Sequence, residues 1–370
     1  MSAAITFLLV VTAATERVAV CILGRIRAVE IAAKAQQQNL YDVLCGGSCK
    51  KPQNSVDIFM SGPLENALQL EAAAALFKDF QWMVKGVRFQ DESGVLQSLS
   101  RRFPETCQEA LRIRGNWLGT SKRLMRVSGR THRRSGPGIF MMYGSQHCLE
   151  MIEAHEELLS LEYDRVVTTR TDLFWAFAHP TLTALSPSAA WIPDTWEDDW
   201  GGLYDRHLVY PRSAARWVLG GWDMLTSGKA FRLLLEVLGE GALLSNSTNT
   251  EVWLAARLLA GQVPVSRFPA TAYLSCDLSE WTTKGGATWA GPNTFHGSVH
   301  GFKCLPGGYR YPKEKAAVDA FVKCLEGQGG WSRAAAQKCY CGHLEPHDLY
   351  ALCTNSWGKS KQNAFEHGRR

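Results

Sequence analysis

Apolar and polar residues alternate along the chain with two different spacings. Short apolar runs rich in β-branched residues are typical of buried strands, and longer segments with apolar residues every three or four positions are typical of amphipathic helices. The short runs predict strands at 17–24, 56–60, 84–89, 164–175, 188–194 and 263–269. The longer segments predict helices at 25–44, 64–80, 141–163, 228–240 and 249–262.

This alternation of strands with helices favours an α/β fold, in which a Rossmann-like, mostly parallel sheet carries helices on both faces. The alternating pattern forms one predicted domain over residues 17–300, with a basic insertion at 90–138 that we expect to be irregular or partly helical. Residues 301–370 are rich in Gly, Lys and Cys, which indicates a small appendage. The chain of 370 residues, 46% of them hydrophobic, is long enough for one large domain.

One predicted strand is interrupted by charges. Residues 166–175 read VVTTRTDLFW, so Arg170 and Asp172 stand two positions apart inside an apolar run. A strand buried in a sheet excludes such charges unless the chain leaves the sheet there. Ligands of open parallel sheets bind beyond the carboxyl ends of the strands, where Asp172 could hold a divalent cation. The alternative is a structural pair of Arg170 with Asp172 that fixes the end of the strand.

Two further polar clusters stand at predicted element boundaries. Gly24 ends the first predicted strand, and Arg27 follows at the start of a helix, where a guanidinium could bind phosphate. The chain contains neither the GxGxxG nor the GxxxxGK[ST] motif. Asp205 and Arg206 lie in the segment GGLYDRHLV. Glu251 begins a predicted helix, where it either complements the helix dipole or acts as a general base on an acceptor hydroxyl.

The loop before Asp205 mixes acids with tryptophans, in the sequence WEDDW at 196–200. Sugars are commonly held by carboxylates beside indole faces, and solvated loop acids are the alternative interpretation.

The net charge of +5 is modest, and many of the chain's basic residues gather between 101 and 134. No aromatic interleaving accompanies them, so we do not expect nucleic acid as a partner. They form either a solvated loop or a patch for an anionic substrate or membrane surface.

The segment ITFLLVVTAA at 5–14 is too short to span a bilayer. Residues 1–16 are therefore a possible signal peptide, a first strand or a ragged N-terminus. Elsewhere in the chain, no stretch is long and apolar enough to predict a transmembrane helix.

Among the 11 cysteines, Cys45 and Cys49 bracket a GGS segment, and three others cluster with two histidines at 339–353. That tail could bind zinc or form disulfides. Clustered cysteines and a glycosylation sequon at Asn246 favour an oxidising lumen.

Four segments carry a resemblance to a known family. In chain order they are RVAVCILGRIR, YGSQHCLEMIEAHEELLSLEYDRVVTTRTDLFW, WIPDTWEDDWGGLYDRHLVYP and NTEVWLAARLLAGQVPVSRFP, and they span about residues 17–275. These segments resemble an uncharacterised family of glycosyltransferase-like proteins from plants, algae and bacteria, with members of lipopolysaccharide-synthesis type. The resemblance implies a GT-A-like fold with a nucleotide-sugar donor and an acidic metal ligand after a central strand.

Residue by residue, the resemblance implies donor contacts, a metal ligand and catalytic acids. The donor contacts would be Gly24, Arg27, Arg170 and Arg206, the metal ligand Asp172, and the catalytic acids Asp205 and Glu251. The implied metal is Mn²⁺ or Mg²⁺. This chain has Thr168 and Thr171 where the family has arginine and proline, and it lacks a full D-x-D motif.

The sequence therefore predicts a glycosyltransferase that moves a sugar from a nucleotide-sugar donor to a glycan or another hydroxyl acceptor. The expected compartment is the secretory-pathway lumen (Golgi or endoplasmic reticulum) or the extracellular space, with the cytoplasm as the alternative. The incomplete acidic motif favours a rival interpretation, a non-catalytic glycan- or nucleotide-binding module that keeps the fold. A third interpretation is an interaction protein stabilised by zinc in the tail.

Overall fold

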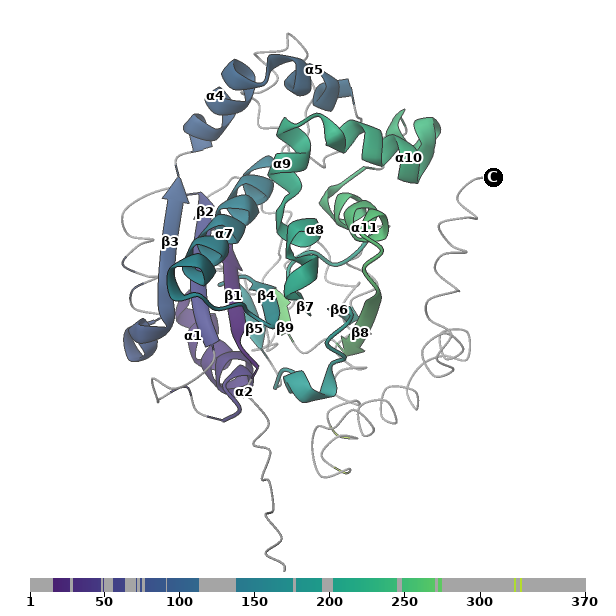
Figure 1. The fold of residues 1–370 in the computed structure, drawn as a ribbon. Helices are drawn as coiled ribbons and strands as arrows, with labels where there is room; N and C mark the ends of the chain where they lie inside the picture. The colour runs from purple at the N-terminus through teal and green to yellow at the C-terminus, as the bar shows by residue number, and fades with distance from the viewer. Residues whose placement is uncertain are drawn as a thin grey trace, which may run out of the picture.

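A seven-stranded sheet forms the centre of the computed structural model, with strand order β3-β2-β1-β4-β7-β6-β8 (Figure 1). The structure describes residues 16–26, 29–47, 49, 56–63, 71, 74, 77–90, 92–112, 138–175, 178–194, 202–244, 248–269, 272–274, 323 and 327. The strands of this sheet are β1 (Val18–Leu23), β2 (Val56–Pro63), β3 (Val84–Gln90), β4 (Arg165–Thr169), β6 (Ala190–Asp194), β7 (Leu208–Pro211) and β8 (Val265–Pro269).

Most neighbouring strands of the sheet are parallel. β1 pairs in parallel with β2 and β4, β2 with β3, and β6 with β8, whereas β7 runs antiparallel to both of its neighbours. The predicted α/β fold with a mostly parallel sheet is confirmed. Because β7 runs the opposite way, its first residue, Leu208, pairs with Thr168 near the carboxyl end of β4. The segment before β7 therefore reaches the edge where the parallel strands end.

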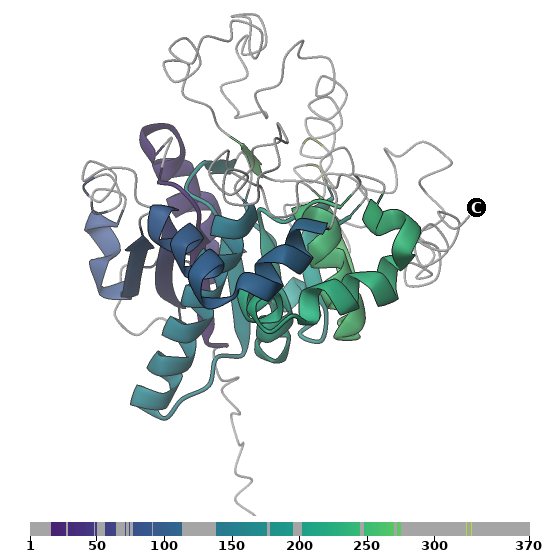
Figure 2. The same ribbon diagram turned by 90° about the horizontal axis from the view of Figure 1, so that it is seen from above.

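Helices lie on both faces of the sheet (Figures 1 and 2). One face carries α1 (Val29–Gln36), a π-helical turn η1 (Gln37–Tyr41) and α2 (Asp42–Leu44). The other face carries α7 (Gly138–Leu159), α8 (Ala215–Leu219) and α11 (Thr250–Ala260). The remaining helical segments are α4 (Glu92–Arg102), α5 (Pro104–Arg112), α9 (Gly221–Thr226), α10 (Lys229–Leu244), η2 (Lys78–Met83), η3 (Leu182–Ala184) and η5 (Arg212–Ala214).

Strand β1 explains why the core has two halves. All six of its residues are buried, and successive side chains of a strand point to opposite faces. Val18 and Ile22 pack into the cluster that contains Leu40 beside α1, whereas Cys21 packs into the cluster that contains Leu149 of α7. A continuous apolar run is what a strand covered on both faces requires.

The segment 164–175 leaves the sheet where its charges begin. β4 ends at Thr169, and the chain resumes as β5 (Leu173–Trp175) in a separate two-stranded sheet with β9 (Ala272–Leu274). The prediction that Arg170 marks an exit from the sheet is confirmed. The expectation that 263–269 forms the final strand is wrong, because β9 follows β8 and pairs antiparallel with β5.

Several other boundaries differ from the expectations. β2 runs on through Ser61, Gly62 and Pro63, which we expected to end it, because Ser61 and Gly62 pack against the turn after β1. The basic insertion contributes α4 and α5. Most of the helix predicted at 64–80 lies outside the described residues, as do residues 1–15, 196–200 and 339–353 with their predicted roles. Within the described part of the chain, none of the helices has the length and apolarity needed to cross a bilayer.

Candidate functional site

A buried glutamine organises the turn between β4 and β5. The two N–H groups of the Gln36 Nε2 amide, at the end of α1, are shared among the carbonyl oxygens of Arg170 (3.0 Å), Thr171 (2.8 Å) and Leu173 (2.9 Å). The Gln36 side chain is completely buried. Carbonyl groups that leave a β-ladder inside a protein need new donors, and Gln36 supplies them. Asn39 continues this contact by donating to the carbonyl oxygen of Trp175 at 2.8 Å.

Within this turn Arg170 and Asp172 form a bidentate ion pair. Nε of Arg170 donates to Oδ1 of Asp172 at 2.8 Å, and Nη2 donates to Oδ2 at 2.6 Å. Asp172 is only 3% exposed. Burial opposes the charge of Arg170, but the Asp172 charge and hydrogen bonds outweigh it and raise the pKa of the guanidinium. The sequence left two interpretations of Asp172 open, a cation ligand and a structural ion pair with Arg170. The described geometry agrees with the ion pair.

The loop that carries Asp205 and Arg206 is docked onto the start of α11 through a glycine. The backbone N–H of Leu203 donates to the carbonyl oxygen of Glu251 at 3.1 Å. A Cβ atom on Gly202 would lie 2.2 Å from the carbonyl carbon of Glu251, so only glycine allows this approach. Arg206 is buried and lies over the ring of Tyr204, 5.3 Å from its centroid.

Glu251 is a buried carboxyl group in the first turn of α11. The helix begins with a side-chain cap, since Oδ1 of Asn249 accepts from the N–H of Val252 at 2.7 Å. The hydroxyl of Thr250 donates to Oε2 of Glu251 at 3.0 Å. Burial, and then the negative charge of Asp205, raise the pKa of Glu251 to about 7, although the nearby Arg206 charge acts in the opposite direction.

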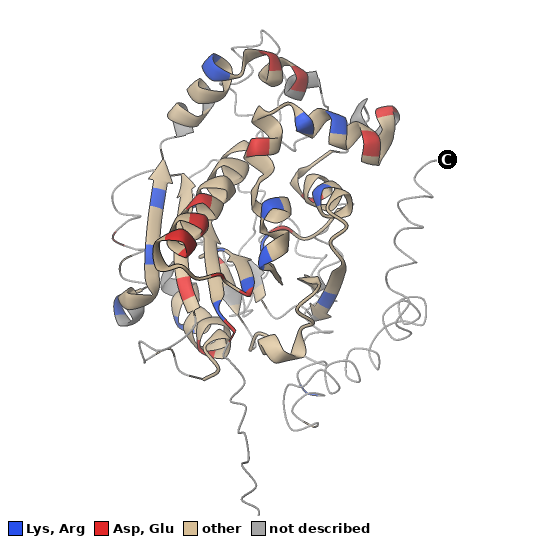
Figure 3. Ribbon diagram, in the orientation of Figure 1, with Lys and Arg blue, Asp and Glu red and all other residues tan. Residues whose placement is uncertain are grey.

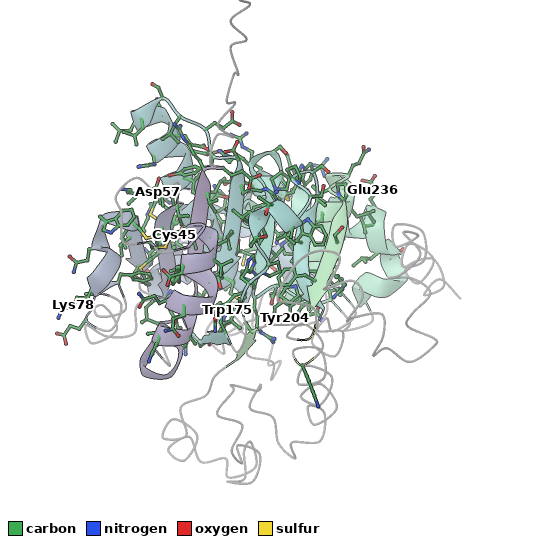
Figure 4. All side chains as sticks on the ribbon, turned by 90° about the horizontal axis from the view of Figure 1, so that it is seen from below. Cys45, Asp57, Lys78, Trp175, Tyr204 and Glu236 are labelled. Atoms are coloured by element: carbon green, nitrogen blue, oxygen red, sulfur yellow. A yellow bond between two sulfur atoms is a disulfide. The ribbon has the colours of Figure 1, made fainter. Side chains whose placement is uncertain are left out.

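The fold brings the three acidic segments of the sequence together. The charges of Asp205 and Arg206 act on the pKa of Arg170 as well as on that of Glu251. Residues about 80 positions apart in sequence therefore share one electrostatic environment beside the carboxyl ends of the parallel strands. In Figure 4 the labelled Trp175, at the end of β5, and Tyr204, next to Asp205, lie towards one border of the molecule, away from Asp57 at the start of β2.

Gly24 belongs to the same edge of the sheet. It has a φ of +97°, which favours glycine, and its N–H donates to the carbonyl oxygen of Ser61 at 3.0 Å. The turn after β1 also meets the turn after β4, because the hydroxyl of Thr171 donates to the carbonyl oxygen of Arg25 at 3.3 Å. Arg27, the predicted phosphate contact, lies outside the described residues.

The described residues do not fit a divalent-cation site at Asp172. Both of its carboxylate oxygens accept from Arg170, and no group of three or more His, Cys, Asp or Glu side chains gathers within the described part of the chain. Divalent cations bound by proteins take several oxygen ligands. Metal binding by Asp172 stays a prediction, and the acidic segment 196–200 lies outside the described residues.

Acidic residues also lie along α7 (Figure 3), where they form ion pairs with arginines of neighbouring elements. These pairs are Glu150 with Arg88, Glu153 with Arg216, and Glu156 with Arg212. The first two of these pairs are largely exposed to solvent and contribute little to stability, whereas Arg212 and Glu156 are mostly buried. The two exposed pairs contrast with the Arg170 and Glu251 cluster, whose members are mostly buried and whose charges perturb one another.

Two features of this region were not predicted from the sequence. A small cavity beside Asp205 is lined by Arg257, a residue that is only 7% exposed. An arginine within the apolar helix VWLAARLLA is the signal that could have indicated it. Next to Arg206, His207 is completely buried against His179, with ring centroids 5.2 Å apart. Burial lowers the pKa of His179 to about 3 and that of His207 well below its ordinary value.

Disulfides link four of the described cysteines. Cys45 pairs with Cys49, across the GGS segment that the sequence singled out, and Cys21 of β1 pairs with Cys148 of α7. Among the described residues Cys107 is a free and buried thiol. The Cys21–Cys148 disulfide could not be expected from spacing, because 127 positions separate the two cysteines.

Comparison with known proteins adds little to these observations. No family model matches the chain, and no curated protein matches it. Among solved structures, the apo crystal structure of mouse xyloside xylosyltransferase 1 matches with a TM-score of 0.33 and 11% sequence identity, over 80% of this chain and 99% of that one. A TM-score this low is too weak to carry a conclusion about fold or function.

Proposed function

We propose that this protein is a glycosyltransferase with a GT-A-like fold, which transfers a sugar from a nucleotide-sugar donor to the hydroxyl group of a glycan or another acceptor. One observation carries the proposal. Glu251 is a carboxyl group with a pKa raised to about 7, beside the carboxyl ends of the parallel strands where ligands of such sheets bind. A carboxylate with a pKa near neutrality is suited to accept a proton from an attacking hydroxyl.

Glu251 would act as the general base and Asp205 as its partner. The negative charge of Asp205 raises the pKa of Glu251, which makes its ionised form a stronger base. Asp205 is half-buried, so it could also accept a hydrogen bond from the acceptor and orient it. The contact of Gly202 with the Glu251 peptide supports these roles, because it fixes the loop of Asp205 relative to α11.

The donor phosphates would lie next to the guanidinium groups of this edge. Arg206 and Arg170 share their electrostatic environment with both acids, and Gly24 forms the tight turn expected of a loop that approaches a ligand closely. Asp172 does not carry the proposal, because Arg170 occupies both of its oxygens. The requirement for the expected Mn²⁺ or Mg²⁺ is therefore tested in the assay, and none of the proposed residue roles depends on the metal.

The proposed compartment is the lumen of the secretory pathway or the extracellular space. Disulfides persist in oxidising compartments and are rare in the cytosol. The pairs Cys45–Cys49 and Cys21–Cys148 support an oxidising location.

A second candidate function is a non-catalytic glycan- or nucleotide-binding module with the same fold. The ion pair of Arg170 with Asp172 favours it, since a carboxylate bound in this way is not available as the metal ligand that the resemblance implies. Such a module would bind a nucleotide sugar or glycan without turnover.

The deciding experiment incubates the purified full-length protein with a panel of nucleotide sugars and hydroxyl acceptors, once with Mn²⁺ and once with EDTA. Turnover supports the enzyme, and binding without turnover supports the module. In the Glu251→Gln variant we expect kcat to fall by about 10²–10⁴-fold with an unchanged donor Kd, because general-base catalysis contributes that much. Glu157→Gln, at an exposed position of α7, is the matched control. The absence of turnover, together with the absence of binding of any donor or glycan acceptor across the panel, would contradict both functions.

A further inference from the structure

A cavity of about 50 Å³ lies between the first turns of α7 and α11, next to the candidate site. Its walls include Gly138 at the start of α7, Thr250 at the start of α11, and Thr168 near the end of β4. A single water needs about 10–15 Å³ of such space, so the cavity holds a group of a few heavy atoms. The cavity lies beside the N-terminal halves of both helices, where the helix macrodipoles favour negative charge.

Arg257 contributes a buried positive charge to the wall of this cavity. The residue is buried, and one nitrogen of its guanidinium, Nη1, donates to the carbonyl oxygen of Val218 at 2.8 Å. Nε has no acceptor, and no acid forms an ion pair with Arg257 among the residues that the structure describes. The face of the group lies 5.2 Å from the ring centroid of Trp253.

A buried guanidinium without a counterion is costly. Burial lowers the pKa of Arg257 to about 10, so the group still carries its charge at neutral pH. Asp205 also lines the cavity and acts on Arg257 in the favourable direction, but it forms no ion pair with the guanidinium among the described contacts. Glu251, with a pKa of about 7, adds only part of a negative charge. Within the described part of the chain, Arg257 therefore has carboxyl groups nearby but none that pairs with it.

We propose that this cavity is an anion subsite in which Arg257 binds a phosphate-sized group. The identity of the ligand rests on the proposed function: the anion is then a phosphate of the nucleotide-sugar donor, and otherwise it is free orthophosphate or another small phosphate ester. A guanidinium forms charge-assisted hydrogen bonds with phosphate oxygens, and the dipoles of α7 and α11 support them. With this assignment, Arg257 would neutralise the negative charge of the donor phosphate.

Thermal unfolding with inorganic phosphate tests the subsite directly. We expect orthophosphate at about 100 times its Kd to raise the Tm of the wild-type chain by about 2–5 °C. The same rise should occur in Arg216→Gln, which changes a mostly exposed arginine of the neighbouring α8. Arg257→Gln should lose the rise. An equal rise in Arg257→Gln and wild type, or no rise in wild type, would overturn the proposal.

Two further measurements keep the test decisive if Arg257→Gln folds poorly. Arg257→Lys, which retains the charge but not the fork, should bind orthophosphate more weakly than wild type and more tightly than Arg257→Gln. In a crystal of the wild-type protein soaked in phosphate, the anion should contact Arg257. Density for phosphate only at other positions would overturn the assignment.

Comparison of ligands separates this proposal from the proposed function. UDP, GDP and ADP should compete with orthophosphate if the donor occupies the subsite, and uridine should not. Orthophosphate binding that depends on Arg257, without binding of any nucleotide, would support the subsite and remove the donor from it. Turnover of a nucleotide sugar that is unchanged in Arg257→Gln would support the proposed enzyme and overturn the assignment of the donor phosphate to this subsite.

Discussion

Gln36 and Thr171 stand 135 positions apart in the sequence, and the amide of the first donates to the carbonyl oxygen of the second at 2.8 Å. This bond joins α1 to the turn where the chain leaves the seven-stranded sheet. The same amide also reaches the carbonyl oxygens of Arg170 and Leu173. The helix α1, which follows the first strand of the sheet, therefore holds in place the backbone that carries the Arg170–Asp172 pair.

Replacement of Gln36 by leucine should destabilise the fold. Three carbonyl groups would lose a buried donor, and a buried polar group without a partner costs about 1–3 kcal/mol. We expect the free energy of unfolding in urea to fall by about that amount. Gln38→Leu, at an exposed position two residues away, is the control and should stay within about 0.5 kcal/mol of wild type. Equal effects of the two substitutions would contradict the role assigned to Gln36.

Replacement of Gly202 by alanine should separate the Asp205 loop from α11. The new Cβ atom would lie 2.2 Å from the carbonyl carbon of Glu251, which is backbone and cannot rotate away. We expect a loss of about 1–3 kcal/mol in the free energy of unfolding, together with weaker donor binding. Gly94→Ala in α4 has nothing within 4 Å of its Cβ and should be neutral or slightly stabilising. Donor binding that survives Gly202→Ala would show that the loop contact is not needed for the site.

The sequence was most informative where local chemistry decides the structure. The β-branched run before Arg170 predicted both the strand and the exit from the sheet, because unpaired charges are costly inside a covered strand. The spacing of Arg170 and Asp172 could not decide between a ligand site and an ion pair. Both arrangements use the same two residues, and the difference lies in the side-chain geometry.

Contacts between distant segments could not be predicted. The role of Gln36 depends on a turn more than 130 positions away, and Arg257 becomes unusual only when the cavity beside it is known. Glu251 was identified from its place at a helix start, but its raised pKa requires the approach of Asp205. The three segments meet because β7 runs antiparallel, and no local pattern encodes that direction.

The buried histidines predict a loss of stability in acid. An unfolded histidine has a pKa of about 6.5, whereas burial lowers the folded value of His179 to about 3 and lowers that of His207 as well. Below pH 6.5 the unfolded chain therefore binds protons that the folded chain excludes, and stability falls as the pH falls. Each histidine contributes a slope of about 1.4 kcal/mol per pH unit in this window.

His207→Phe should remove one of these two slopes. The ring of His207 lies among Trp175, His179 and Phe268, so phenylalanine has apolar neighbours there. Neither ring nitrogen of His207 has a hydrogen-bond partner among the described residues, so the variant loses no bond. Urea unfolding at pH 7.5 should give similar stabilities, and at pH 4.5–5.5 the variant should be more stable than wild type. A parallel decline of both proteins with pH would contradict this prediction.

Glu251 should have the opposite pH dependence. Its folded pKa, about 7, lies above the ordinary glutamate value of 4.5, so between these values the folded chain holds a proton that the unfolded chain releases. Stability is therefore lost as the pH rises from 4.5 to 7, by about 1–3 kcal/mol in total. Glu251→Gln removes this loss and should be more stable than wild type above pH 7. If Glu251 is the general base, wild-type kcat should rise with pH through about 7, because only the ionised carboxylate accepts a proton.

The variant Asp205→Asn tests the cause of this shift. Burial would still raise the pKa of Glu251, but the negative charge of Asp205 would be gone and the positive charge of Arg206 would remain. The stability loss should then end at a lower pH, and the rise of kcat should move to lower pH by a similar amount. The two measurements report the same ionisation in different states of the protein, so they must move together if Glu251 acts directly on the acceptor. A shift of the stability curve alone would assign Glu251 a structural role and remove it as the base.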